Sequence, residues 1–193
     1  MSFHNISVFA SGNGTNFEAI EKAIEEHRIH DAKIVLLIVD HKDAPVIDRA
    51  RRLKVPYAIV ERKDYESKEK YEEHILALLK AKEVEWIFLA GYMKIIEHTL
   101  LDAYPNRIIN IHPALLPAFK GAHAIQDSYD YGVKVFGITI HYVSKELDGG
   151  KIIAQKAFEY TEGETVEEVE TRIHALEHAL YPAVVEKLLH EEK

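Results

Sequence analysis

The chain has 193 residues, which is enough for one large domain with a sizeable buried core. Its net charge of −8 argues against a nucleic-acid surface, and the absence of cysteine excludes a disulfide framework and a thiolate metal site. No stretch approaches the roughly twenty apolar residues of a membrane span, and the first residues lack a secretory signal. A cytoplasmic protein without nucleic-acid or membrane partners is expected.

Short runs of apolar residues alternate with helical patterns through the first half of the chain. The runs cover residues 6–10, 34–39, 57–60, 86–90 and 108–111. Their continuous apolar character predicts a parallel sheet covered on both faces. Apolar residues recur at spacings of three and four in 16–27 and 67–81, which predicts helices, and a less regular pattern predicts another at 44–53.

The pattern changes after Pro117. A segment punctuated by glycine leads to residues 135–143 and 152–157, which alternate more and are expected to pair with each other. A long final helix is predicted from about residue 165 to 189. Because no repeat or linker separates the two halves, the expected fold is a single α/β domain. It has a mostly parallel, Rossmann-like central sheet flanked by helices, with later strands partly antiparallel and a long C-terminal helix.

A glycine-rich turn, Ser11-Gly12-Asn13-Gly14-Thr15-Asn16, follows the first predicted strand and opens the first predicted helix. Exposed backbone N–H groups and the helix dipole favour an anion at such a place. The dinucleotide fingerprint needs a glycine where Phe17 stands, and the Walker motif is absent, so a phosphate monoester is the better candidate. A tight turn with Thr15 or Asn16 as helix cap explains the same residues equally well.

The segment Asn110-Ile111-His112-Pro113 sets an amide and an imidazole two residues apart at the end of a predicted strand. Residues i and i+2 of a strand share a face, so Asn110 and His112 are expected to point to the same side. An amide can polarise a carbonyl oxygen, and an imidazole beside it can donate or accept a proton, so the pair suits acyl transfer. Taken alone, such a histidine is more often a structural hydrogen-bonding residue.

The loop Asp148-Gly149-Gly150 follows an alternating segment, and its two glycines allow Asp148 to turn inward. A carboxylate near His112 would orient the imidazole or stabilise its charge. The same residues are typical of a plain hairpin turn, which pattern alone favours.

Six motifs occur in one order along the chain. They are Ser-Gly-Asn-Gly-Thr-Asn at 11–16, Leu-Ala-Gly-Tyr-Met-Lys at 89–94, Asn-Ile-His-Pro-Ala-Leu-Leu-Pro at 110–117, Gly-Ile-Thr-Ile-His-Tyr-Val at 137–143, Leu-Asp-Gly-Gly at 147–150 and Glu-His-Ala-Leu-Tyr-Pro at 177–182. Together they closely resemble the phosphoribosylglycinamide formyltransferases (glycinamide ribonucleotide transformylases) of the folate-dependent formyltransferase superfamily. The resemblance implies transfer of the formyl group of 10-formyltetrahydrofolate to the amine of glycinamide ribonucleotide in de novo purine biosynthesis. It also implies direct attack by the amine, with no covalent enzyme intermediate. No metal is expected, because the candidate site offers one imidazole and one carboxylate and no thiolate.

The resemblance implies residue roles as well. The catalytic residues would be Asn110, His112 and Asp148. Residues in contact with the ribonucleotide would be Gly12, Asn13, Gly14, Thr15, Met93, Pro113, His174 and Glu177. Residues in contact with the folate would be Lys68, Tyr92, Met93, Lys94, Ile95, Ile96, Asn110, Val143 and Leu147. The single formyltransferase domain, residues 1–193, would thus have a phosphate- and substrate-binding half at about 1–105. The half at about 106–193 would be folate-binding and catalytic.

Two alternatives stay open. Another folate-dependent enzyme, such as formyltetrahydrofolate deformylase or methionyl-tRNA formyltransferase, normally carries an extra domain, for which this chain is expected to leave no room. A non-catalytic sugar-phosphate-binding module would use the glycine-rich turn alone. Lys68 stands where many relatives have arginine, which replaces a bidentate fork with a point charge. The expected partners are small molecules, and the expected assembly is a monomer or homodimer.

Overall fold

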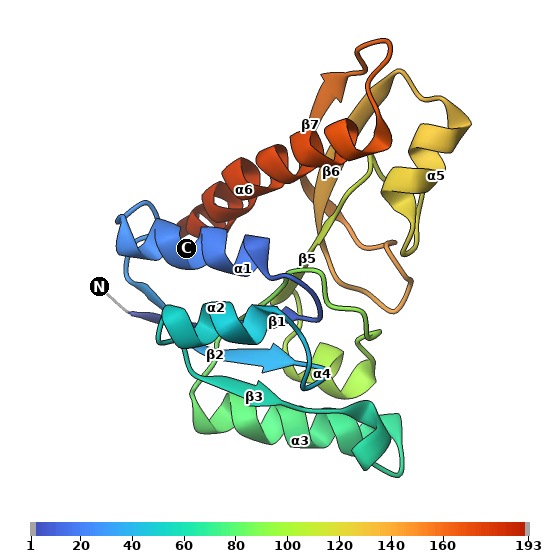
Figure 1. Ribbon diagram of the computed structural model, residues 1–193. Helices are drawn as coiled ribbons and strands as arrows, with labels where there is room; N and C mark the ends of the chain where they lie inside the picture. Colours follow the sequence, from blue (N-terminus) through green and yellow to red (C-terminus); the bar gives the residue numbers. More distant parts are fainter. Residues whose placement is uncertain (1–2, 192–193) are drawn as a thin grey trace.

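The computed structural model describes residues 3–191 and contains one seven-stranded sheet with helices on both faces (Figure 1). The strands are β1 His4–Ala10, β2 Ala32–Val39, β3 Tyr57–Ile59, β4 Trp86–Leu89, β5 Ile108–His112, β6 Val135–Tyr142 and β7 Ile152–Glu159. Their order across the sheet is β3-β2-β1-β4-β5-β6-β7. Neighbours from β3 to β5 are parallel, whereas β6 is antiparallel to β5 and β7 to β6. The predicted α/β class and the pairing of the two late strands are confirmed.

Six α-helices connect or cover these strands in the part of the chain from residue 3 to 191. They are α1 Thr15–Glu25, α2 Val46–Arg52, α3 Lys68–Ala81, α4 His98–Ala103, α5 Ala124–Tyr131 and α6 Val166–Glu191, with a short 3₁₀ turn, η1, at Arg62–Asp64. The four predicted helices correspond to α1, α2, α3 and α6. The sequence pattern predicts neither α4 nor α5, which have six and eight residues. Helices this short show only a weak period, and α2, with seven residues, is likewise indicated only by a less regular pattern.

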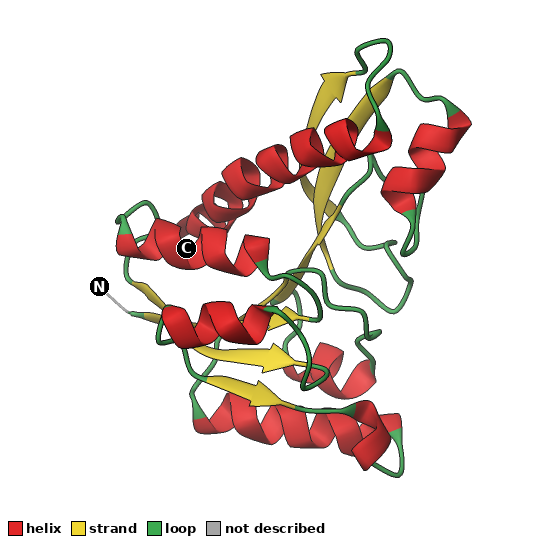
Figure 2. Ribbon diagram, in the orientation of Figure 1, coloured by secondary structure: helices red, strands yellow, loops and turns green. Residues whose placement is uncertain are grey.

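The helices form a layer on each face of the sheet (Figure 2). One core joins α1, α2 and α6 to the sheet, and the other joins α3 and α4 to it. In β1, Val8 belongs to the first core and Phe9 to the second, and both side chains are fully buried. Burial on both sides explains why this strand is apolar at successive positions.

The chain reverses its direction of travel across the sheet between β1 and β4. It passes from β1 outward to β2 and β3, then returns to place β4 on the other side of β1. Loops leaving the carboxyl ends of β1 and β4 therefore diverge and leave a crevice, which is the usual ligand site of an open α/β sheet. The glycine-rich turn follows β1, residues 90–97 follow β4, and His112 ends the neighbouring strand β5.

Candidate active site

A cavity of about 610 Å³ opens at this edge of the sheet. Every residue assigned to the substrates or to catalysis, with the exception of Lys68, lines it. Lys68 lines a smaller adjoining cavity of about 190 Å³, which shares Met93, Lys94 and Ile95 with the larger one. The larger cavity thus collects side chains from both halves of the chain.

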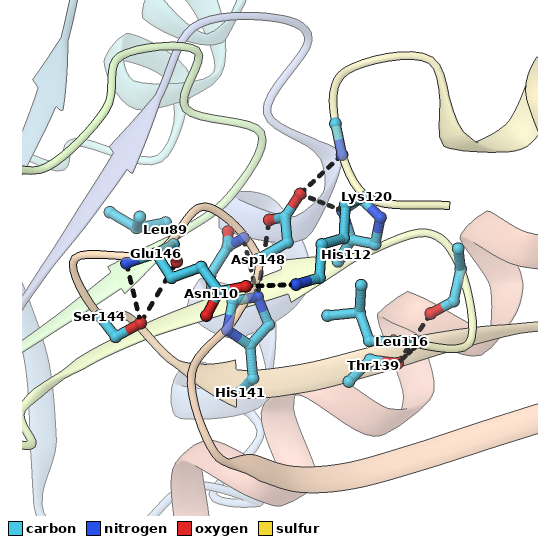
Figure 3. A network of polar contacts seen from close by, with 12 residues as sticks. Leu89, Asn110, His112, Leu116, Lys120, Thr139, His141, Ser144, Glu146 and Asp148 are labelled. Atoms are coloured by element: carbon cyan, nitrogen blue, oxygen red, sulfur yellow. Dashed lines mark hydrogen bonds and ion pairs between the residues drawn. The ribbon is translucent and has the colours of Figure 1, made fainter. Parts of the chain in front are cut away.

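His112 is buried at the end of β5 and uses both ring nitrogens (Figure 3). Its Nε2 lies 2.7 Å from the carbonyl oxygen of Phe119, and its Nδ1 lies 3.6 Å from Oδ2 of Asp148. Because a carbonyl only accepts, Nε2 carries a proton and donates it to Phe119. Nδ1 is therefore the nitrogen that can exchange a proton on the side of Asp148.

Asp148 reaches His112 because the loop between β6 and β7 folds back onto β6. A β-carbon at Gly150 would overlap the carbonyl oxygen of Tyr142, so only glycine permits this close approach. Asp148 itself has a φ of 50°, a left-handed conformation that aspartate tolerates better than most residues. Its Oδ2 accepts a hydrogen bond of 2.8 Å from the N–H of Gly121. The loop is at once a turn and the carrier of an inward carboxylate.

Asn110 is oriented by a second histidine that stands opposite it in β6. The antiparallel register pairs Asn110 with His141, and Asn110 Nδ2 lies 3.3 Å from His141 Nε2. His141 Nδ1 donates to the carbonyl oxygen of Tyr142 at 3.0 Å, and burial lowers the pKa of His141, so the ring is neutral and Nε2 accepts from the amide. One N–H of Asn110 is thereby engaged, which leaves its second N–H for a ligand oxygen.

Glu177 and Asn16 form a buried polar pair at the other end of the cavity. Glu177 Oε2 accepts from Asn16 Nδ2 at 3.3 Å, and its Oε1 lies 2.6 Å from His174 Nδ1. The hydrogen bond to Glu177 raises the pKa of His174, which favours the imidazolium at this end. Oδ1 of Asn16 is buried without a hydrogen-bond partner among the described residues, and Asn16 is one of the residues that line the cavity.

The glycine-rich turn does not begin α1 with a side-chain cap, so the alternative in which Thr15 or Asn16 caps the helix is wrong. The residue before the helix is Gly14, with a φ of 75° and no side-chain hydrogen bond. A β-carbon at Gly14 would also overlap the side chain of Val46, so both backbone and packing require glycine. The uncapped backbone N–H groups of the first helical turn lie beside the cavity.

Residues 92–96 form the apolar wall of the cavity. The side chains of Met93 and Ile95 are 64% and 60% exposed, and Leu147 across the opening is 55% exposed. Three large apolar side chains around one opening are suited to a flat hydrophobic ligand. The wall is anchored to the glycine-rich turn because the Met93 N–H donates to Ser11 Oγ at 2.8 Å.

Several lining residues were not assigned from the sequence, among them Asn16, His141 and His178. The sequence pattern indicates Asn16 only as a possible cap, and His141 only as part of an alternating strand. Their contacts to Glu177 and Asn110 join distant parts of the chain, so no local pattern reports them. In the described part of the chain, no group of three or more acidic or histidine side chains is arranged to hold a metal ion.

No helix between residues 3 and 191 has both the length and the apolar character needed to cross a bilayer. The helix α6 has the required length, but acidic side chains such as Glu167, Glu168 and Glu186 are spread along it.

Comparison with known proteins agrees with this geometry. The formyl transferase family model matches residues 4–185. The chain is 51% identical to the phosphoribosylglycinamide formyltransferase of Bacillus subtilis (strain 168) over 183 residues, covering 95% of this chain and 93% of that protein. The crystal structure of phosphoribosylglycinamide formyltransferase from Bacillus halodurans superposes with a TM-score of 0.94 at 44% identity, covering 98% and 97% of the two chains. That of glycinamide ribonucleotide transformylase 1 from Geobacillus kaustophilus gives 0.93 at 47% identity, covering 97% and 99%. The chain belongs to the formyl transferase family.

Proposed function

We propose that this protein is a phosphoribosylglycinamide formyltransferase, which transfers the formyl group of 10-formyltetrahydrofolate to the amine of glycinamide ribonucleotide in purine biosynthesis. The observation that carries the proposal is a single cavity lined by the glycine-rich turn, by the polar side chains of Asn110, His112 and Asp148, and by the apolar wall. A ribonucleotide and a folate need such a shared space, because the amine must reach the formyl carbon. The relatives that the chain matches carry this name.

The ribonucleotide is assigned to the end of the cavity formed by the turn and α6. Backbone N–H groups of Gly12 to Thr15 suit the phosphate, and the imidazolium favoured at His174 adds positive charge. Both ring nitrogens of His174 lie near carboxylates, those of Glu177 and Glu170, so its contribution is electrostatic in this arrangement. The buried carboxylate of Glu177 suits a ribose hydroxyl, which is a hydrogen-bond donor.

The folate is assigned to the apolar wall formed by residues 92–96, with Val143 and Leu147 opposite. The exposed apolar side chains around the opening fit a flat ring, whose burial would remove their surface from water. Folate supplies the formyl group to be transferred. Lys68 lies beyond Met93 in the smaller adjoining cavity and pairs with Glu97 at 2.7 Å, so its role toward a folate carboxylate requires exchange of that partner.

Asn110, His112 and Asp148 move the proton and stabilise the charge that develops during the transfer. The amine nitrogen forms a bond to the formyl carbon, the bond from that carbon to the folate nitrogen breaks, and one proton moves from the amine to that nitrogen. The free N–H of Asn110 and a proton on Nδ1 of His112 stabilise the negative oxygen that develops during the attack. Asp148, whose Oδ2 lies 3.6 Å from that Nδ1, orients the imidazole and accepts a proton directly or through water.

The direct test is an assay of formyl transfer by the purified protein. With 10-formyltetrahydrofolate and glycinamide ribonucleotide, we expect formylated product and tetrahydrofolate in equal amounts. With water alone or with an aminoacylated initiator tRNA as acceptor, we expect only background turnover. Release of free formate without the ribonucleotide at a comparable rate would instead favour a deformylase, and the absence of all turnover would favour a binding module.

A further inference from the structure

The carbonyl oxygens of the glycine-rich turn are directed toward α2. The N–H of Val46 donates to the oxygen of Gly12 at 3.0 Å, and Nε of Arg49 donates to the oxygen of Asn13 at 2.6 Å. Gly14 packs so closely on Val46 that a β-carbon there would overlap it. The helix α2 therefore supports three consecutive residues of the turn.

The direction of these carbonyls sets the direction of the neighbouring N–H groups. In a planar trans peptide the C=O and the N–H point in opposite directions. Holding the oxygens of Gly12 and Asn13 toward α2 thus turns the N–H groups of Asn13 and Gly14 away from α2, toward the cavity that these residues line. If the peptide between Asn13 and Gly14 rotated so that the Asn13 carbonyl pointed toward the cavity, an acceptor would replace the Gly14 N–H donor at the place where an anion is expected.

Arg49 is fixed by a buried carboxylate. Glu18 is 8% exposed and contacts Arg49, Arg52 and Lys22. Burial alone would raise the pKa of Glu18, but hydrogen bonds from Arg52, Arg49 and Lys22 together lower it to about 2. Glu18 is therefore ionised at neutral pH and holds the guanidinium of Arg49 between itself and the Asn13 carbonyl.

We propose that Arg49 is a positioning residue for the phosphate of the substrate. Arg49 does not line the cavity, and it acts by holding the Asn13 carbonyl away so that the Gly14 N–H faces the phosphate. The proposal rests on the function proposed above and adds a residue outside the substrate contacts. Arg52 offers a matched comparison, since it donates to the same carboxylate at 2.9 Å but makes no hydrogen bond to the turn among the described residues.

The test compares Arg49→Met with Arg52→Met, using glycinamide ribonucleotide and the riboside that lacks the phosphate. For the ribonucleotide, Arg49→Met should raise KM roughly tenfold, as expected for one charge-assisted hydrogen bond, and change kcat and the folate KM less than about twofold. Arg52→Met should leave the ribonucleotide KM, kcat and the folate KM within about twofold of the wild type. With the riboside, kcat/KM should be the same for both variants and the wild type.

Three results would overturn the proposal. An equal increase of the ribonucleotide KM in Arg49→Met and Arg52→Met would mean that only the positive charge matters. A loss of kcat/KM in Arg49→Met that is as large with the riboside as with the ribonucleotide would mean a general distortion of the site. An unchanged ribonucleotide KM in a folded Arg49→Met variant would mean that the turn does not need the arginine.

Binding of ribose 5-phosphate, measured by calorimetry, provides a readout that does not depend on formyl transfer. Arg49→Lys keeps the charge beside Glu18 but loses the fork that joins Glu18 to Asn13, so it should bind ribose 5-phosphate several-fold more weakly than the wild type. Wild-type affinity in Arg49→Lys would contradict the proposal even if Arg49→Met failed to fold. If the wild type bound ribose 5-phosphate but transferred no formyl group, the proposed function would fail, and several-fold weaker binding by Arg49→Lys would still support the role of Arg49 toward a phosphate.

Discussion

Asn110, His112 and Asp148 each have a neighbour that determines their orientation. His141 accepts from the amide of Asn110, the Phe119 carbonyl accepts from His112, and the Gly121 N–H donates to Asp148. These contacts fix which atoms remain for a substrate, namely one amide N–H and Nδ1 of the imidazole. Such preorganisation is what makes donors effective against a charge that develops during reaction.

We expect Asn110→Ala, His112→Ala and Asp148→Asn each to lower kcat by roughly a hundredfold or more, because each removes one part of a preorganised site. Combined variants should lose far less than the product of the single losses, since the three residues act on one carbon atom. Steady-state kinetics at saturating substrate measures the loss. Calorimetric binding of glycinamide ribonucleotide shows that each variant is folded.

Ser144→Ala is the matched control for these variants, because Ser144 lines the same cavity but bonds only to Glu146 within the described chain. Its turnover should remain within about threefold of the wild type. Near-wild-type turnover in a folded Asp148→Asn variant would leave Asp148-Gly149-Gly150 as a plain turn.

At the scale of elements, the helix α3 holds the apolar wall of the cavity in place. Glu72 is 3% exposed, and its carboxylate accepts from the N–H groups of Glu97 at 2.5 Å and Leu100 at 3.0 Å. These N–H groups lie at the start of α4, where backbone donors have no partner within the helix. The Glu72 side chain of α3 therefore caps the helix that follows the wall. At the other end, the hydroxyls of Tyr71 and Tyr92 share a hydrogen bond.

Glu72→Gln should raise the KM for the folate roughly tenfold, because one of two charge-assisted hydrogen bonds is replaced by an amide facing an N–H group. The KM for the ribonucleotide should stay within about twofold of the wild type, since the glycine-rich turn leads into α1, which packs in the core on the other face of the sheet. Steady-state kinetics with each substrate varied in turn separates the two effects. The neighbouring Glu73→Gln, which removes only an exposed ion pair with Lys70, should change neither constant. Equal increases in both constants for Glu72→Gln would argue against a local role.

At the scale of the whole molecule, one half-buried carboxylate, that of Glu21, opposes folding at neutral and higher pH. Oε2 of Glu21 on α1 is buried without a hydrogen-bond partner among the described residues. Burial, with repulsion from Glu25, raises the pKa of Glu21 to about 7. The folded protein thus holds this proton more tightly than the unfolded chain does. Its stability therefore falls as the pH rises from the unfolded pKa through about 7.

Glu21→Gln should accordingly increase the free energy of unfolding at pH 8 by on the order of 1–3 kcal/mol, since the neutral amide avoids the cost of a buried charge. At pH 5 the gain should largely disappear, because the wild-type side chain is then protonated in the folded state. Urea denaturation at the two pH values measures the difference. Glu26→Gln, an exposed change at the residue that follows α1, should leave the free energy of unfolding within about 0.5 kcal/mol of the wild type at both pH values. A gain that does not depend on pH would contradict the assignment.

Local patterns in the sequence predicted the strands, four of the helices and the residues of the candidate site. The strands were predictable because parallel strands covered on both faces must be apolar at successive positions, as Val8 and Phe9 show. The long helices were predictable because their periods repeat over several turns. The shared face of Asn110 and His112 followed from strand geometry alone, and the motifs in their order indicated the family.

Tertiary structure decided the contacts that join distant segments. His141 orients Asn110 only because the antiparallel register of β5 and β6 places them opposite each other, and a shift of one residue would turn His141 to the other face. Arg49 reaches the glycine-rich turn only because α2 packs behind it, and Lys68 lies in the adjoining cavity because α3 covers the other face. A sequence pattern reports the period of one element, whereas these contacts depend on how two elements are placed against each other. That placement is set by the packing of the two cores on the sheet.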